Sequence, residues 1–373
     1  MPRSPSIGID FADDKIRIVR MRFEPFAYIE GVDELSLPGY LSDDHLVFDT
    51  KSLHQVLKKV SSDTPRDARC VFSMPNACTN FTWMRMQKME PRELREVARY
   101  RVRRGDDDVE RLAVAVMESV ADEKLVVSSS AEVLNQRKEI LDKAGFQVVG
   151  AESQSQSILR STGQSMALEA SLANTASMTI AHITEGRTNV VVVQNGRLNF
   201  ARSSRIGYSG LLAKAAETLA ISPQEIDPIL FCRTAEMGSD FQCRVIYQDR
   251  AFMVDMTQPM NAFVKEFRRV QNYFRSLHPE RSFSGMIDRL VISGLPTLTT
   301  GFASTLSRAL ALRISSHRPT WRIPIIADND TVETLSMRHP SYAVPIGLAL
   351  APYGTVVEQP RTEEAFVWNL RAA

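Results

Sequence analysis

The chain has 373 residues, of which 44% are hydrophobic and 24% charged, and its formal net charge is +1. This length is enough for two or more domains with separate cores, and the near-neutral charge excludes a general electrostatic attraction to nucleic acid or to a membrane surface. The four cysteines are scattered without a Cys-x-x-Cys pair, which argues against a structural zinc site and against a disulfide framework.

The sequence also lacks the patterns of membrane insertion and export. No apolar run approaches the roughly 20 residues that span a bilayer, and residues 1–6 have no signal-peptide core. Scattered free thiols fit a reducing compartment. We therefore expect a cytoplasmic protein that reaches a membrane only through a partner.

Residues 1–75 are predicted to form a first α/β lobe. Residues 7–11 and 16–23 alternate as two strands of a hairpin around a short polar turn, and residues 27–37 add a third strand. The apolar residues of 52–60 recur at helical spacing, and residues 68–73 have the composition of a buried strand.

Residues 76–150 are predicted to form a small α+β subdomain, inserted in the lobe, in the order strand, helix, two strands, helix, strand. Its first strand carries Phe81 and Trp83 on one face and Met84 and Met86 on the other. Most of these side chains suit a core. The alternative is that one face lines a groove for an extended peptide, to which methionine and aromatic side chains adapt well.

Residues 151–177 are expected to return into the first lobe and cross to a second lobe at 178–353. The second lobe repeats the opening hairpin, with strands at 179–183 and 189–193 around a polar turn at 184–188, followed by a tight Asn-Gly turn. Further elements are predicted by periodicity: helices at 209–220, 223–231, 260–274, 302–312 and 344–351, strands at 288–293 and 323–326, and either helix or strand at 240–249. The remaining residues, 354–373, are expected to form a poorly ordered tail whose Phe366, Trp368 and Leu370 could dock elsewhere on the protein.

The order and spacing of these segments resemble the PilM-like proteins of type IV pilus assembly. Residues 6–21 and 179–206 resemble the two phosphate loops of that family, and 76–150 resembles the extra subdomain that it shares with the cell-division protein FtsA. Residues 288–302 resemble the adenosine-side strand and helix, and the cytoplasmic part of the secretion protein GspL is similar too. The resemblance implies an α/β, actin-like (ribonuclease H-like) duplicated fold with ATP and a metal between its lobes.

The first phosphate loop departs from the family pattern. Asp10 is kept, Ala12 replaces a glycine, and Asp13 and Asp14 replace small hydroxylated residues. Two carboxylates that faced a triphosphate would repel it, whereas as ordinary turn formers they would point to solvent. The sequence leaves these two orientations open.

The second phosphate loop and the adenosine side depart as well. Thr188 and Asn189 are kept, His182 stands where the family has an aspartate, and Arg187 could contact a phosphate. Gly294 is kept, but the following Leu-Pro would crowd a base or sugar. Glu225 aligns with the adenosine-side glutamate of the family, without the lysine that normally follows.

The resemblance implies a scaffold at the inner face of the inner membrane, which binds the cytoplasmic N-terminal peptide of a bitopic PilN-like protein and other pilus-assembly components. Self-association is left open, and no nucleic acid is expected.

Because three loops have changed together, we expect no catalytic residue, no bound cofactor and no metal. The alternative is a nucleotide-switched ATPase that holds ATP or ADP with magnesium near Asp10. The residues of this nucleotide site, retained or vestigial, are Asp10, Ala12, Asp13, Arg187, Thr188, Asn189, Glu225 and Gly294. Whether the machine is a pilus or a type II secretion system stays open.

Overall fold

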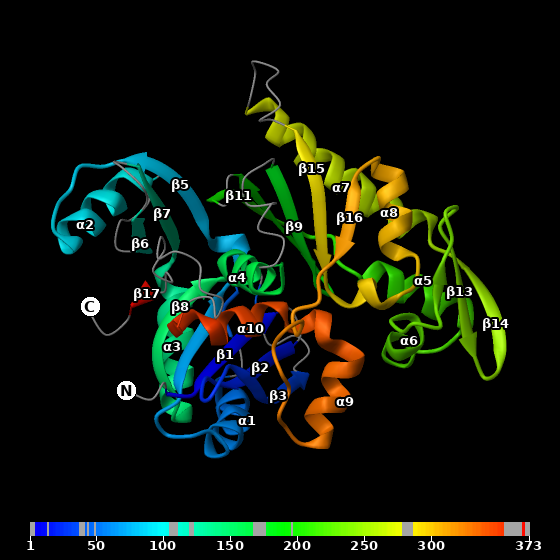
Figure 1. The fold of residues 1–373 in the computed structure, drawn as a ribbon, viewed down its shortest axis with the longest axis horizontal. Coiled ribbons are helices and arrows are strands. Elements are labelled where there is room, and N and C mark those ends of the chain that lie inside the picture. The colour runs from blue at the N-terminus through cyan, green and yellow to red at the C-terminus, as the bar shows by residue number, and fades with distance from the viewer. Residues whose placement is uncertain are drawn as a thin grey trace. The chain divides into compact units, whose positions relative to one another are not determined.

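The computed structural model describes residues 4–12, 15–36, 42, 45–47, 50–103, 111–118, 123–166, 177–194, 197–277, 286–353 and 368–369. The chain forms two compact units, each built from more than one stretch of sequence (Figure 1). Unit 1 comprises Met1–Gln164, Arg322–Thr334 and Val344–Ala373, and unit 2 comprises Ser165–Trp321 and Leu335–Ala343. The predicted second lobe therefore loses 322–334 and 344–353 to unit 1, because these late segments pack on the first sheet.

Unit 1 is built on a six-stranded sheet in the order β17-β8-β4-β1-β2-β3. Its elements outside the insert are β1 Ser6–Ala12, β2 Lys15–Arg22, β3 Tyr28–Ser36, α1 Thr50–Ser62, β4 Arg69–Met74, η1 Asn76–Cys78, α3 Ala131–Ala144, β8 Gln147–Ser153, α4 Gln154–Met166, α10 Ala343–Leu350, η7 Ala351–Tyr353 and β17 Trp368–Asn369. Helix α9, Asn329–Arg338, begins in unit 1 and ends in unit 2.

The central strand β1 is buried along its whole length because it has a strand on each side and a helix against it. It pairs antiparallel with β2 and parallel with β4. Helix α10 approaches it so closely that a Cβ on Gly8 would lie 2.0 Å from the carbonyl oxygen of Pro345. A Cβ on Gly347 of α10 would likewise lie 1.9 Å from the carbonyl oxygen of Ser157 on α4. These two glycines therefore allow α10 to pack against β1 and α4.

The insert of unit 1 is smaller than the predicted subdomain. It consists of β5 Asn80–Arg85, α2 Pro91–Val102, β6 Leu112–Glu118 and β7 Glu123–Ser130, with the sheet order β5-β7-β6. Helix α2 covers one face of this sheet, and Leu94 and Ala98 pack there against Val114 and Val126. The helix and strand predicted to end the insert are α3 and β8, and β8 pairs parallel with β4 in the main sheet. Local periodicity identified both elements but carries no information on which sheet a strand joins.

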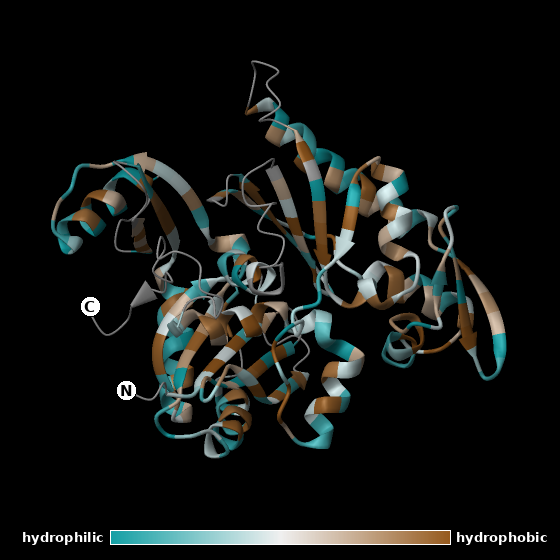
Figure 2. Ribbon diagram, in the orientation of Figure 1, coloured by the Kyte–Doolittle hydropathy of each residue, from teal (hydrophilic) through white to brown (hydrophobic). Residues whose placement is uncertain are grey.

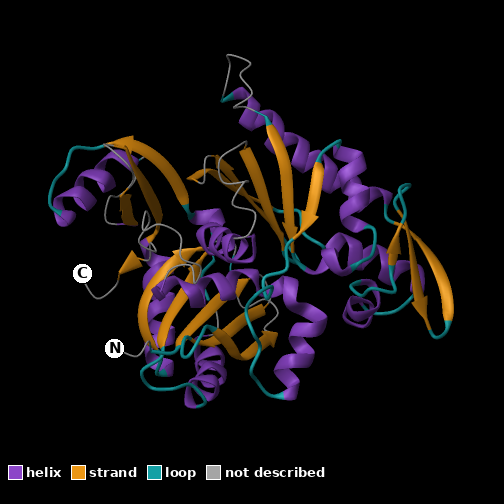
Figure 3. Ribbon diagram, in the orientation of Figure 1, coloured by secondary structure: helices purple, strands orange, loops and turns teal. Residues whose placement is uncertain are grey.

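Unit 2 is built on a five-stranded sheet, β11-β10-β9-β15-β16, with a separate three-stranded sheet, β12-β13-β14 (Figure 3). Its elements are β9 Ser177–Ile183, β10 Thr188–Gln194, β11 Arg197–Ser204, α5 Ser209–Leu219, α6 Pro223–Leu230, β12 Glu236–Met237, β13 Gln242–Tyr247, β14 Arg250–Asp255, α7 Thr257–Ser276, β15 Ile287–Ser293, η5 Leu295–Leu298, α8 Phe302–Leu310, β16 Arg313–Ser316 and η6 His339–Tyr342.

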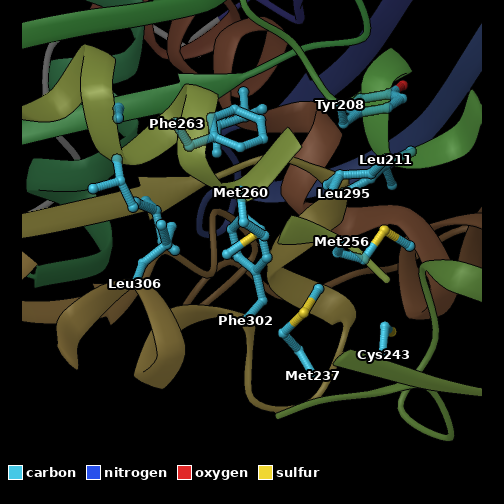
Figure 4. Packing of buried hydrophobic residues seen from close by; sticks show 14 of the residues in the cluster. Tyr208, Leu211, Met237, Cys243, Met256, Met260, Phe263, Leu295, Phe302 and Leu306 are labelled. Atoms are coloured by element: carbon cyan, nitrogen blue, oxygen red, sulfur yellow. The ribbon is translucent and has the colours of Figure 1, made fainter. Parts of the chain in front are cut away.

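The core of unit 2 lies between its main sheet and the long amphipathic helix α7. The middle of β15 is hydrophobic in Figure 2, and the buried face of α7 carries Met260 and Phe263. Figure 4 shows both side chains close to Phe302 of α8, and the rings of Phe263 and Phe302 meet edge to face with centroids 6.1 Å apart. The predicted apolar stripe of 260–274 is thus the core face of α7.

The predicted α/β class and both hairpins are confirmed. Residues 240–249, left open by the sequence, contain strand β13, whereas β14, β16 and α9 were not predicted. The strand predicted at 323–326 is wrong, because this segment forms only an isolated bridge from Ile325 to Ile29 of β3. Within the described part of the chain, no helix is long and apolar enough to span a bilayer.

Candidate functional site

Asp10 lies in the interior of unit 1, on strand β1 and two residues before its end. Its Oδ1 accepts a hydrogen bond of 3.1 Å from Nε2 of Gln154, the first residue of α4. Its Oδ2 has no hydrogen-bond partner among the described residues, although the side chain is fully buried. A buried carboxylate oxygen without a partner is costly to the fold, which marks Asp10 as a candidate functional residue.

The surroundings of Asp10 act on its pKa in opposite directions. Burial raises the pKa of the carboxyl above its ordinary value. The hydrogen bond from Gln154, the hydroxyl of Ser73 and the positive charges of Arg17 and Arg137 lower the pKa, but burial has the larger effect. We call Asp10, Ser73, Arg137 and Gln154 the Asp10 cluster.

Arg137 is a member of the Asp10 cluster that the sequence analysis did not indicate, and the same is true of Ser73 and Gln154. It is fully buried, its Nη1 donates to the carbonyl oxygen of Ser73 at 2.7 Å, and its guanidinium carbon lies 4.7 Å from the ring centroid of Phe11. The hydroxyl of Ser73 in turn accepts a 2.9 Å bond from the backbone N–H of Phe11. The strand around Asp10 is therefore held by contacts from β4 and α3.

Strands β1 and β2 remain paired as far as Ala12 and Lys15, so only residues 13 and 14 connect them. Ala12 is itself buried and paired, and the predicted site residue Asp13 lies outside the described residues. The two orientations that the sequence leaves open for the loop carboxylates accordingly stay open.

The second predicted loop, residues 184–188 of unit 2, is closed by hydrogen bonds within the unit. The backbone N–H of Thr184 donates to the carbonyl oxygen of Arg187 at 2.8 Å, and that of Arg187 to the hydroxyl of Thr184 at 3.2 Å. The carbonyl oxygens of Thr184 and Glu185 accept from the N–H groups of Tyr208 and Ser209. This loop uses these groups to pack against the start of α5.

Thr188 and Asn189, the residues that keep the family pattern, are both buried. The hydroxyl of Thr188 donates to the carbonyl oxygen of Ile206 at 2.6 Å. Asn189 faces His182 across the β9–β10 pair, and His182 faces Ser293 across the β9–β15 pair. Asn189, His182 and Ser293 thus form one row across the sheet, and all three are buried in the interior of unit 2.

Gly294 follows the carboxyl end of β15 with φ at 108°. A Cβ there would lie 2.0 Å from the carbonyl oxygen of Ile183, so the glycine is required by the close approach of β9 and β15. The next two residues, Leu295 and Pro296, are buried, and Leu295 belongs to the core of unit 2. The fold alone therefore explains why these residues occur here.

Glu225 has a local role in helix α6. Its carboxylate accepts from the N–H and hydroxyl of Ser222, while the Ser222 hydroxyl accepts from the N–H of Glu225, which forms a capping box. These hydrogen bonds lower the pKa of Glu225. In the same helix, Asp227 accepts two 3.0 Å bonds from Arg338, a bidentate pair that the sequence did not suggest.

These observations allow a test of whether the two loops suit ATP and magnesium. A phosphate loop needs small side chains and backbone N–H groups that point toward the ligand. Here the backbone N–H groups of Phe11, Thr184 and Arg187 donate hydrogen bonds to side-chain or backbone oxygens of the same unit. These three N–H groups are therefore not available to a phosphate. No cluster of three metal-binding side chains occurs among the described residues either.

The predicted peptide-binding residues divide between the two faces of the insert sheet. Met86 is buried in the core beneath α2, and Met84 packs against the same core. Phe81 and Trp83 lie half-buried on the opposite face of the edge strand β5. We call this second surface the Trp83 face.

Comparisons with known proteins agree with this architecture. No protein-family model and no curated protein matches the sequence. A chain of the PilM–PilN type IV pilus biogenesis complex is similar with a TM-score of 0.70 and 18% identity, covering 94% of this chain and 98% of that one. The ethanolamine utilization protein EutJ from Carboxydothermus hydrogenoformans has a TM-score of 0.51 and 13% identity, with 94% and 90% covered. The resemblance to PilM-like proteins is thus confirmed at the level of structure, and the chain has their actin-like fold.

Proposed function

We propose that this protein is a cytoplasmic scaffold of a type IV pilus-like or type II secretion-like assembly machine. In this proposal it binds the cytoplasmic N-terminal segment of a PilN-like, bitopic inner-membrane protein. The observation that carries the proposal is the similarity to a chain of the PilM–PilN complex at TM-score 0.70 over 94% of this chain and 98% of that one.

The proposal also holds that the scaffold works without nucleotide turnover. Hydrogen bonds within unit 2 already use the hydroxyl of Thr188 and the N–H groups of Thr184 and Arg187. In unit 1, Ala12 stands where the family has a glycine. Restoring a phosphate loop would require these hydrogen bonds to break. This supports binding to a protein partner, rather than to ATP, as the role of the fold in this protein.

Calorimetric titration tests the proposal directly. A synthetic peptide covering the cytoplasmic N-terminal segment of the PilN-like protein should bind, and millimolar Mg-ATP should leave the melting temperature unchanged. A ligand at 100 times its Kd adds about 2.7 kcal/mol to the stability of the protein that binds it, which a thermal melt detects easily. Peptide that fails to bind would refute the scaffold, and a clear shift with Mg-ATP would refute the loss of nucleotide binding.

A second function, a nucleotide-switched ATPase, is favoured by one observation. Asp10 is buried with a raised pKa and an unpartnered Oδ2, as expected of a carboxylate kept for a ligand. If this reading holds, Mg-ATP raises the melting temperature of the parent protein and not that of Asp10→Ala. If Mg-ATP changes the melting temperatures of the parent and of Asp10→Ala by the same amount, this second function is refuted.

Location and further partners follow from the same proposal. The scaffold would sit at the inner face of the inner membrane because its partner is anchored there, and would contact other assembly components. Fractionation of cells with and without the PilN-like gene checks this, since membrane association should disappear with that gene. Sedimentation of the purified protein tests self-association, which the fold leaves open.

A further inference from the structure

Strand β14 is an edge of the small sheet of unit 2 (Figure 1). The sheet order is β12-β13-β14, so β13 pairs with one side of β14, and no strand of the described residues pairs with the other. The N–H of Met256, directly after β14, donates to the carbonyl oxygen of Phe241 at 2.9 Å, on the β13 side. Because backbone groups alternate along a strand, the N–H and C=O groups of Ala251, Met253 and Asp255 point away from β13. These groups form a row of donors and acceptors that can receive another strand.

The other sheet edges among the described residues of unit 2 carry features that discourage such pairing. Strand β12 has 2 residues and β16 has 4. Strand β11 is longer, but its pairing with β10 contains a register shift, and a bulge of this kind bends an edge away from a neighbouring strand. Strand β14 has 6 residues, no proline and an unbroken register with β13. It is therefore the edge of unit 2 best suited to an added strand.

The outer face of the β13–β14 pair exposes apolar side chains beside this edge. Met253 is 58% exposed and Ile246 is 41% exposed. In the register of the hairpin, Ile246 faces Ala251 and Arg244 faces Met253, so Met253 and Ile246 are diagonal neighbours on one face. The opposite face of the pair contributes to the core of unit 2. Exposed apolar side chains next to an unpaired edge are typical of an interaction surface.

An antiparallel copy of β14 is complementary to this edge. Two copies related by a two-fold axis through Met253 would place the two Met253 residues opposite each other, each donating its N–H to the carbonyl oxygen of the other. Ala251 of each copy would then face Asp255 of the other. An axis through Phe252 would instead place Asp249 opposite Asp255, and directly opposed like charges are destabilising. Charge therefore selects the axis through Met253, which also joins the two exposed apolar surfaces.

We propose that β14 is a dimerisation strand, through which two copies of this chain join their small sheets of unit 2 into one continuous sheet. The occupant of the edge is a second copy, because the backbone row, the apolar side chains and the charges at the strand ends match those of an antiparallel β14. Met253 and Ile246 of the two copies then cover one another. The inference goes beyond the proposed function and does not depend on it, since it uses no contact with a PilN-like peptide.

Analytical ultracentrifugation of the full chain tests the dimer. At micromolar concentrations the parent should sediment with twice the 41.8 kDa mass of one chain. Met253→Pro should weaken the dimer at least about tenfold, because proline removes the two hydrogen bonds at the axis while the pairing with β13 stays intact. Ser316→Pro is the matched control on edge strand β16: the N–H of His317 donates to Ile292 of β15, so that of Ser316 points away from β15. A monomeric parent, or equal dimer affinity in the parent and both variants, would overturn the proposal.

Two charge variants test the register and control for a folding defect. Met253→Glu and Met253→Lys should each weaken the dimer, because two like charges would face each other across the axis. An equimolar mixture should dimerise about tenfold more tightly than either variant alone, since opposite charges then meet. A mixture that dimerises no better than the separate variants would overturn the proposal. A monomeric parent whose binding to the PilN-like peptide is weakened by Met253→Pro would also overturn it, and would make β14 an acceptor for that peptide instead.

Discussion

The contact between α10 and α4 gives a stability prediction that can be worked out from distances. In Gly347→Ala the new methyl carbon would lie 1.9 Å from the carbonyl oxygen of Ser157. A carbon–oxygen contact normally needs about 3.3 Å, so the two helices must separate by more than about 1 Å. The movement also strains the 2.9 Å hydrogen bond from Arg160 to the carbonyl oxygen of Gly347.

The size of the effect follows from these two losses. Overpacking costs about 1–3 kcal/mol, and a hydrogen bond from a charged donor is worth about 1.5–3 kcal/mol. Alanine in place of glycine returns about 0.5–1 kcal/mol of backbone entropy. We therefore expect Gly347→Ala to lower the free energy of unfolding of unit 1 by about 2–5 kcal/mol.

Urea unfolding followed by circular dichroism measures this loss, and α4 itself supplies the control. Gly163 lies on the same helix, and a Cβ there would meet no atom within 4 Å. Gly163→Ala should therefore raise stability by about 0.5–1 kcal/mol, through helix propensity alone. If Gly347→Ala unfolds at the same urea concentration as the parent, or if both variants lose stability equally, the close approach of α10 to α4 is not what requires the glycine.

Three further predictions concern buried groups. Asp10→Asn should stabilise the protein at neutral pH, because burial raises the pKa of Asp10 and its ionisation therefore costs stability. The gain should shrink as the pH falls toward the ordinary range of an aspartate, and urea midpoints measured across pH check it; a gain that grows on acidification would contradict the reasoning. Met86→Ala should destabilise the insert by about 2–5 kcal/mol, whereas Thr82→Ala, at an exposed position of β5, should change little, as measured by thermal melts. Burial and the charge of Arg318 lower the pKa of His339 to about 4, so stability should fall as the pH drops from about 6.5 toward that value. A proton NMR titration measures this pKa, and Arg318→Ala should move it upward; a pKa near the ordinary histidine value would refute the argument.

The elements that could be predicted from the sequence are those whose signal is local. Alternation and turn residues are contained in a few neighbouring positions, which is why both opening hairpins were found at nearly their observed bounds. The short strand β16, Arg313–Ser316, was missed because three of its four side chains are exposed, so it carries no apolar pattern. Helix α9 was missed for a similar reason: it has few apolar positions and much of its surface is exposed.

The candidate site also depends on contacts between residues that are far apart in the sequence, which local patterns do not reveal. Asp10 was found because its place in a recognisable order of segments survives, but its neighbours Ser73, Arg137 and Gln154 come from β4, α3 and α4. Nothing in the spacing of those residues along the chain indicates that they meet. One usable signal existed at Gln154: a polar run directly after a buried parallel strand is where ligands gather in α/β sheets. The other neighbours of Asp10 could be identified only from the three-dimensional structure.

The composition of unit 1 from separate stretches has a consequence for biosynthesis. Strand β1 is among the first parts of the chain to leave the ribosome, whereas α10, which packs against Gly8, emerges only after all of the main sheet of unit 2 has been made. In the nascent chain, an apolar face of β1 therefore stays uncovered until a helix encoded more than 300 residues later has been synthesised. Contacts so distant in sequence form slowly and leave incomplete chains prone to aggregation. A fragment ending at Met166 should for this reason depend on chaperones, and its solubility should recover when a peptide of residues 343–353 is supplied.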